Sequence, residues 1–380
     1  MQINNLSTRK KYFHKYILLF VCVLLFPALT HADIKHQKLW SYDNSSAYLH
    51  NVSNYEKLTR FSDDGSLLIT TRESRSDAGY SIVKVWNVKT LKCIQTFKIA
   101  YLLSLAISPD NKKMAVIKGE EFLPHYPDTG HPFSVETYSI DSGALEKILV
   151  EPTHGSLSFT GLAFSPDSKF LVTGSGDSLV RIWDLKSGKV VEKLLQGGWT
   201  KYIGFTHRQT RLVALGGRYM FYRNMKLWSL HPKKILKAID DNDDERVSAR
   251  DIKITSFTMA PNGKWFATNN SDHQVQIFNS DTLALWQHLP KNKSRHNSSL
   301  PIKVVFSPDS KLIAFVRDGQ ITIRKASNIN EIVRTFPIVQ DKSDPGSSRM
   351  LALSFSKSGK QLQWVTDENY SIFLWKADMQ

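Results

Sequence analysis

The sequence repeats one pattern seven times between residues 60 and 376. Each copy begins with a short apolar run that passes into a small or hydroxylated residue and then into a tight turn. In the clearest copies the turn is Pro-Asp or Pro-Asn, in which Pro presets φ and the following residues tolerate turn geometry. The seven turns occupy residues 60–65, 106–111, 163–168, 204–207, 258–263, 305–310 and 354–359. A period of about 50 residues constrains the fold strongly, because it requires a stack of similar supersecondary units.

Three further runs follow each turn. The first is apolar and β-rich, as in residues 170–173, and the second alternates and ends in an aromatic residue in most copies, as in residues 180–183. A small turn and a last apolar run, such as residues 190–194, complete the copy. Period-two alternation with β-branched and aromatic residues is the signal of a strand. The sequence therefore predicts an all-β chain of seven units with four short strands each.

The copy at residues 154–184 resembles the WD-repeat family of β-propellers almost from end to end. The resemblance implies a seven-bladed β-propeller over residues 33–380, with one blade per copy. It also implies a structural hydrogen-bond tetrad of His154, Thr173, Asp177 and Trp183, which would satisfy buried polar groups in that blade. Only Trp183-Asp184 is a true Trp-Asp pair, so the chain is identified as a degenerate member.

The last copy ends at Trp375, on the third strand of its blade. That blade lacks an outer strand of its own, and we expect residues 36–42 to supply it. Pairing of this N-terminal strand with the last blade would close the propeller and remove the open edge of the ring.

Residues 1–32 have the layout of a secretory signal peptide. Four basic residues and no acid precede an unbroken apolar run at residues 17–29, and small residues stand at 30 and 32. The run is too short for a membrane span, which needs roughly 20 residues. We therefore expect cleavage after Ala32 and an exported protein, periplasmic or secreted, with no membrane span after cleavage. A retained anchor is the alternative.

Motifs that carry chemistry are scarce. The sequence has no nucleophile elbow, phosphate-binding Gly-rich loop or metalloprotease helix motif. Residues 120–131 contain two His and three carboxylates, but their spacing fits no metal template, and an exposed loop is the preferred interpretation. The acidic run at residues 240–245 lacks the glycine and glutamate of a calcium loop. We expect no enzyme, no cofactor and no metal, with a propeller enzyme that has an unrecognised metal or cofactor site as the rival.

Loop length indicates where a partner would bind. The long segments connect strands two and three (72–80, 119–133, 216–224) or successive blades (240–251, 290–300, 337–348), and in a propeller both classes open on one face. We expect this face to be a platform for a protein partner. The candidate partner-binding residues are Arg72, Arg75, His125, His131, Tyr219, Tyr222, Lys291, Lys293 and Arg295.

The net charge of +15 leaves a second hypothesis open, binding to an anionic lipid or polysaccharide surface. Nucleic-acid binding is disfavoured, because the basic residues are scattered and the aromatic residues fall in strand positions.

Overall fold

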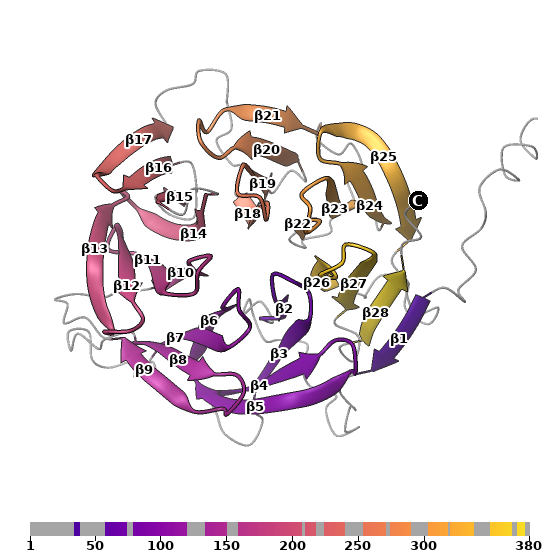
Figure 1. The fold of residues 1–380 in the computed structure, drawn as a ribbon, viewed down its shortest axis with the longest axis horizontal. Coiled ribbons are helices and arrows are strands. Elements are labelled where there is room, and N and C mark those ends of the chain that lie inside the picture. Colours follow the sequence, from indigo (N-terminus) through magenta and orange to yellow (C-terminus); the bar gives the residue numbers. More distant parts are fainter. Residues whose placement is uncertain are drawn as a thin grey trace, which may run out of the picture. The chain divides into compact units, whose positions relative to one another are not determined.

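The computed structural model describes residues 34–38, 58–73, 79–119, 134–149, 159–206, 210–217, 224–239, 254–270, 274–289, 303–317, 320–337, 350–366 and 371–376. These ranges contain strands β1 to β28 and no helix. Apart from β1, the strands follow the repeat, so that each copy of the sequence pattern gives its strands in chain order (Figure 1).

The strands take four positions within the sheets. The first strands are β2 (Arg60–Phe61), β6 (Leu102–Ile107), β10 (Phe159–Phe164), β14 (Trp199–Phe205), β18 (Ile254–Met259), β22 (Val304–Phe306) and β26 (Met350–Phe355). The second strands are β3 (Leu67–Glu73), β7 (Lys113–Lys118), β11 (Phe170–Ser175), β15 (Arg211–Gly217), β19 (Trp265–Asn270), β23 (Leu312–Arg317) and β27 (Gln361–Thr366). The third strands are β4 (Tyr80–Asn87), β8 (Ser134–Ser139), β12 (Leu179–Asp184), β16 (Asn224–Leu230), β20 (Val275–Asn279), β24 (Gln320–Lys325) and β28 (Ser371–Lys376). The fourth strands are β5 (Lys92–Ala100), β9 (Leu145–Leu149), β13 (Lys189–Leu195), β17 (Lys233–Ile239), β21 (Leu285–His288), β25 (Asn328–Pro337) and β1 (Ile34–Lys38).

Each group of four forms one sheet, and the seven sheets are numbered here in chain order from sheet 1 (β2 to β5) to sheet 7 (β26 to β28 with β1). Within sheets 1 to 6 the strands pair with their neighbours in sequence, antiparallel throughout. Seven four-stranded sheets of this kind correspond to propeller blades. The predicted all-β architecture with seven units is thus confirmed.

A register shift marks the same position in sheets 1 to 6. It lies in the pairing of the third strand with the fourth, directly before the residue that aligns with Trp183 of the Trp-Asp pair. That residue is Trp86, Tyr138, Trp183, Trp228, Phe278 or Arg324 in the successive sheets. The equivalence of the repeats therefore extends to a bulge in the backbone, even where the aromatic residue is lost.

Burial explains why the second strands read as continuous apolar runs. In β7, the four residues from Met114 to Ile117 are fully buried, because both faces of the strand are covered by neighbouring sheets. The fourth strands are the most exposed of those described, as β13 shows by its alternation of exposed positions with half-buried or buried ones. A run that is buried on both faces loses its alternation.

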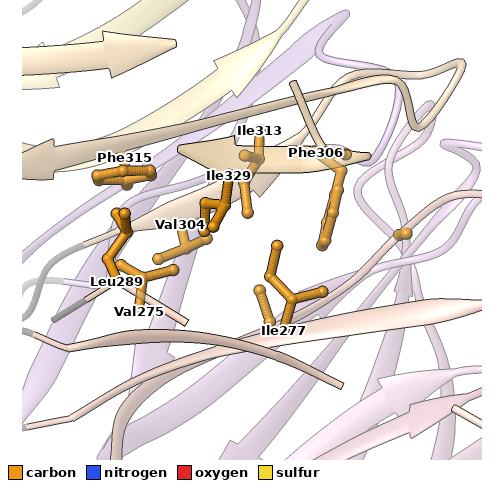
Figure 2. Close-up of a cluster of buried hydrophobic side chains, with 11 residues drawn as sticks. Val275, Ile277, Leu289, Val304, Phe306, Ile313, Phe315 and Ile329 are labelled. Carbon is orange, nitrogen blue, oxygen red and sulfur yellow. The ribbon is translucent and has the colours of Figure 1, made fainter. Parts of the chain in front are cut away.

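The apolar core lies between neighbouring sheets. In the cluster between sheets 5 and 6, Val275, Ile277 and Leu289 meet Phe306 and Phe315 (Figure 2). Sheets 1 and 2, 2 and 3, 3 and 4, and 4 and 5 share similar clusters. Leu68 and Trp86 of sheet 1 also pack with Val365 and Ile372 of sheet 7, so the first and last sheets of the series are neighbours.

The fourth strand of sheet 7 comes from the N-terminal part of the chain, beside β28. It is Ile34–Lys38 rather than residues 36–42, so the expected strand lies earlier than the sequence indicated. Residues 39–42 lie outside the described residues.

The predicted signal peptide, residues 1–32, also lies outside the described residues. Within the part of the chain that the structure describes, no helix has the length and apolar character required to cross a membrane.

Candidate interaction surface

One end of the sheets carries the short turns that join the first strand to the second. In sheet 3, the Ser165 hydroxyl donates a hydrogen bond to Asp167 (2.6 Å) and accepts one from the Phe170 backbone amide (2.9 Å). The same arrangement holds in sheets 1, 2 and 6 around Ser62, Ser108 and Ser307. This end of the sheets, called the turn face below, therefore satisfies its polar groups within each turn.

Neighbouring turns are also connected to one another. The Asn111 side chain donates to the Ser66 hydroxyl (3.0 Å), and the Asn262 backbone N–H donates to the Ser310 hydroxyl (3.0 Å). The Gln363 side chain of sheet 7 donates to the Gly65 carbonyl of sheet 1 (2.5 Å). Gly65 has a φ of +66°, and a Cβ there would lie 2.2 Å from the Phe355 carbonyl oxygen, so only glycine fits this contact.

Sheet 3 contains the best-matched copy of the repeat, and its polar core has two parts. The Trp183 indole donates to the Thr173 hydroxyl (3.0 Å), and both residues are buried. Asp177, in the turn between β11 and β12, accepts two hydrogen bonds from Arg181 at 3.1 and 2.6 Å. The Arg181 side chain is only 1% exposed, so Asp177 neutralises a buried guanidinium. His154 lies outside the described residues, and the tetrad as a whole stays a prediction.

The ionisation of Asp177 follows from these contacts. Burial alone would raise the pKa of its carboxyl. The hydrogen bonds and charge of Arg181, together with the Leu179 amide, hold the pKa below its ordinary value instead. Asp177 is therefore ionised at neutral pH, and the pair joins the turn to the buried middle of β12.

The equivalent position is satisfied by the same Trp–Thr contact in sheet 1 and by different partners in sheets 2 and 4. Trp86 donates to Thr70 (2.9 Å) in sheet 1, and Trp228 donates to the Gln196 side chain (3.2 Å) in sheet 4. In sheet 2 the Tyr138 hydroxyl donates to Glu136, which also pairs with Lys118. Burial and the bond to Glu136 raise the pKa of Tyr138, so it remains a neutral donor.

The opposite end of the sheets is called the long-loop face, because the long loops and the connections between sheets begin there. Tyr80, Leu103 and Trp199 lie at the strand ends of this face, and they are 38%, 36% and 44% exposed. Lys98 lies over the Tyr80 ring, with its Nζ 4.5 Å from the ring centroid. Exposed Tyr and Trp side chains are typical of surfaces that bind other proteins.

Of the candidate partner-binding residues, Arg72 is described. It lies near the end of β3, half-buried, opposite Ile82 of β4, and so on the long-loop face. Arg75, His125, His131, Tyr219, Tyr222, Lys291, Lys293 and Arg295 lie outside the described residues. Leu103 and Trp199 were missed from the sequence, because residues in strand positions were assigned to the core. Tyr80 was not singled out either, although it ends the long segment 72–80.

Groups that could perform chemistry are sparse among the residues that the structure describes. Among the described residues, no three His, Cys, Asp or Glu side chains gather in a way that could hold a metal ion. Cys93, on β5, is exposed and forms no disulfide. Among the described residues, the large exposed apolar side chains lie on the outermost strands and on the long-loop face, whereas the turns of sheets 1, 2, 3 and 6 satisfy their polar groups internally.

The comparisons with known proteins agree with the repeat described above. The family described as WD domain, G-beta repeat matches residues 146–184, the copy that contains Trp183. The U3 small nucleolar RNA-associated protein 12 of Saccharomyces cerevisiae is 26% identical over 232 residues, which cover 61% of this chain and 18% of that protein. The autophagy-related protein 16 of Arabidopsis thaliana is 21% identical over 300 residues, covering 77% of this chain and 51% of that protein.

The target of rapamycin complex subunit LST8 of Bos taurus is 21% identical over 281 residues, covering 71% of this chain and 77% of that protein. The chain thus spans less than two thirds of the yeast and Arabidopsis relatives and more of the bovine one. Fold and repeat together define a repeat protein built from propeller blades. Residues 146–184 match one WD repeat, and the relatives support the similarity to WD-repeat proteins that the sequence indicated.

Proposed function

We propose that this WD-repeat protein is exported and acts as a platform for a protein partner, which binds its long-loop face. The seven sheets would form a closed propeller in which β1 supplies the last strand. WD-repeat proteins generally serve as interaction scaffolds, which supports the general role. The proposal includes no catalytic step, and a stoichiometric metal or quinone in the purified protein would contradict that part.

The contrast between the two ends of the sheets carries the proposal. On the turn face, Ser-Asp hydrogen bonds satisfy the polar groups locally and leave little for a partner to complete. On the long-loop face, Tyr80, Leu103 and Trp199 keep more than a third of their surface in water. Covering such side chains gives free energy of roughly 25 cal/mol per Å² of apolar surface, before the costs of association.

A triple variant tests this assignment, with Tyr80→Ser, Leu103→Ser and Trp199→Ser combined. Interface hot spots are enriched in Trp and Tyr and cost about 2 kcal/mol or more when truncated. We expect capture of the partner from the exporting cell to fall at least about tenfold. The matched control combines Ile94→Ser, Leu145→Ser and Ile332→Ser on the outermost strands, which are similarly exposed. Equal capture by both variants would place the partner elsewhere.

Export has its own test. If residues 1–32 are a signal peptide, the protein recovered from the exporting cell should begin at Asp33. Mass spectrometry of the intact protein distinguishes this form from the full chain. Recovery of a chain that begins at Met1 would contradict cleavage, and its presence in the membrane fraction would favour the retained anchor.

A further inference from the structure

Two tryptophans stack on each other in sheet 5, near the turn face. Trp265 is the first residue of β19, directly after the turn that follows β18, and Trp286 is the second residue of β21. Their ring centroids are 3.8 Å apart and their planes differ by 16°, so the two indoles lie face to face. Trp265 also packs against the apolar cluster between sheets 5 and 6 (Figure 2), so the stack lies on the side of sheet 5 that faces sheet 6.

One face of Trp286 is open to solvent. Trp265 covers the other face, yet Trp286 is 38% exposed. The accessible surface of Trp286 therefore consists of its open face and its ring edges. Trp265 is half-buried, and its contact with the core and with Trp286 holds the outer indole in one plane. A ring that is held in place and open on one face is a preorganised surface for stacking.

A bulge in β21 brings Trp286 to this side of the sheet. Phe278 of β20 lies opposite Leu285, and Ile277 lies opposite Gln287, so Trp286 is the extra residue whose side chain the bulge redirects. Among sheets 1 to 6, only sheet 5 has an aromatic residue at both positions of the stack. The residues in place of Trp265 are Leu67, Lys113, Phe170, Arg211 and Leu312, and those in place of Trp286 are Ile94, Glu146, Val191, Leu236 and Val333.

The neighbouring part of sheet 6 provides uncharged polar groups. Gln287, the residue after Trp286, donates to the Ser327 carbonyl (2.9 Å) and accepts from the Ile329 backbone N–H (2.5 Å). β21 therefore lies against the start of β25 and the turn before it (Figure 1), where Ser327 and Asn328 are exposed. A flat apolar surface thus lies next to a hydroxyl and an amide side chain.

We propose that the Trp265–Trp286 stack binds a saccharide, with one pyranose ring lying flat on the open face of Trp286. A pyranose with equatorial hydroxyls presents a face of axial C–H groups, which complements the negative face of an indole. Its hydroxyls project around the ring edge, where hydroxyl and amide side chains such as Ser327 and Asn328 are suitable partners. Chains of β-1,4-linked glucose or N-acetylglucosamine have rings of this kind.

A cation is the main alternative ligand for an exposed indole face. The charged residues next to the stack are Lys264, which precedes Trp265, and Lys325, which forms an ion pair with Glu331 (2.5 Å). These groups carry no net negative charge that would attract a cation. A neutral ring with an apolar face therefore fits the surroundings better.

Trp286 also has a structural role, because it covers part of the apolar cluster behind Trp265. That role alone predicts a lower melting temperature when the indole is removed, and no affinity for saccharides. Direct measurement of binding therefore separates the two roles. The stack shares no residue with Tyr80, Leu103 and Trp199 of the long-loop face, so this proposal and the proposed protein partner succeed or fail separately.

The test is isothermal titration calorimetry of the purified protein with cellohexaose, with chitohexaose and with choline as the cationic probe. We expect binding of at least one hexasaccharide and no binding of choline. Trp286→Ala should weaken saccharide binding at least about tenfold, which is the order of magnitude of one aromatic stacking contact. Trp286→Tyr keeps an aromatic face and should retain most of the affinity.

Leu285→Ala is the matched control, because Leu285 is the adjacent residue of β21 and is 48% exposed. Leu285 lies opposite Phe278, which packs in the cluster between sheets 4 and 5, so its substitution leaves the stack intact. We expect this variant to bind saccharide as the unaltered protein does. Equal weakening by Leu285→Ala and Trp286→Ala would overturn the proposal. Absence of binding of both hexasaccharides, or binding of choline alone, would overturn it as well.

Discussion

A protein that begins at Asn44 is expected to aggregate, or to melt at a far lower temperature than one that begins at Asp33. The shorter chain lacks β1 (Ile34–Lys38), which lies beside β28 as the fourth strand of sheet 7. β28 would then be the outermost strand, with its backbone N–H and C=O groups unpaired. Thermal melting curves and light scattering of the two proteins measure the effect.

Strand addition provides the control for this deletion. A synthetic peptide of residues 33–43 should raise the melting temperature of the shorter protein, because an extended segment can pair with an exposed strand edge. A peptide of the same composition in scrambled order should have less effect. Identical melting curves for the two proteins would contradict both the role of β1 and closure of the propeller by it.

Asp177→Ala is expected to lower the free energy of unfolding by about 2–4 kcal/mol. The substitution leaves the Arg181 guanidinium, only 1% exposed, without its bidentate carboxylate partner. The matched control is Glu331→Ala, which breaks the ion pair between Glu331 and Lys325. The side chains of these two residues are 46% and 50% exposed, respectively. Exposed pairs contribute at most about 1 kcal/mol, so denaturant titration should separate the two variants clearly.

The effect of Asp177→Ala should also depend on pH. Because the folded state lowers the pKa of Asp177, its ionised form contributes stability above the unfolded pKa, near 3.9. That contribution is lost as the pH falls through the folded pKa. The difference in the free energy of unfolding between wild type and variant should therefore be constant near neutrality and shrink below about pH 4. A difference that is small at pH 7, or that does not shrink in acid, would contradict the assigned pair.

The seven sheets could be predicted because their signal is repeated and redundant. The Ser-Pro-Asp turns show where the first strand ends and the second begins, and the continuous apolar runs identify the second strands, as in residues 106–117. The bounds of β1 were harder to predict. The sequence Lys38-Leu39-Trp40 favours a strand by its apolar residues, whereas β1 lies at residues 34–38 with the sequence IKHQK, which has little such signal. An outermost strand needs backbone pairing more than apolar side chains, so its pattern is weak.

The partner of Asp177 was also missed. Arg181 alternates with apolar residues in β12, and alternation assigns such a residue to the solvent side of a strand. In a stack of sheets both faces of the strand are covered, so the guanidinium is buried and requires a carboxylate. Neighbouring sheets, which a single repeat does not reveal, decide this burial. Tyr80 and Trp199 are the opposite case. They are aromatic residues that a strand pattern assigns to the core, but they lie at strand ends, where the neighbouring sheet does not cover them and they stay exposed.

Site-specific photo-crosslinking in living cells tests the central claim most directly. A benzoylphenylalanine residue is placed at Leu103 or Trp199 on the long-loop face, or at Lys311 or Lys360 on the turn face, and all four positions are exposed. The account predicts one discrete crosslinked protein from the first two positions and none from the other two. Crosslinks to a protein partner from the turn face alone, or from neither face, would contradict it.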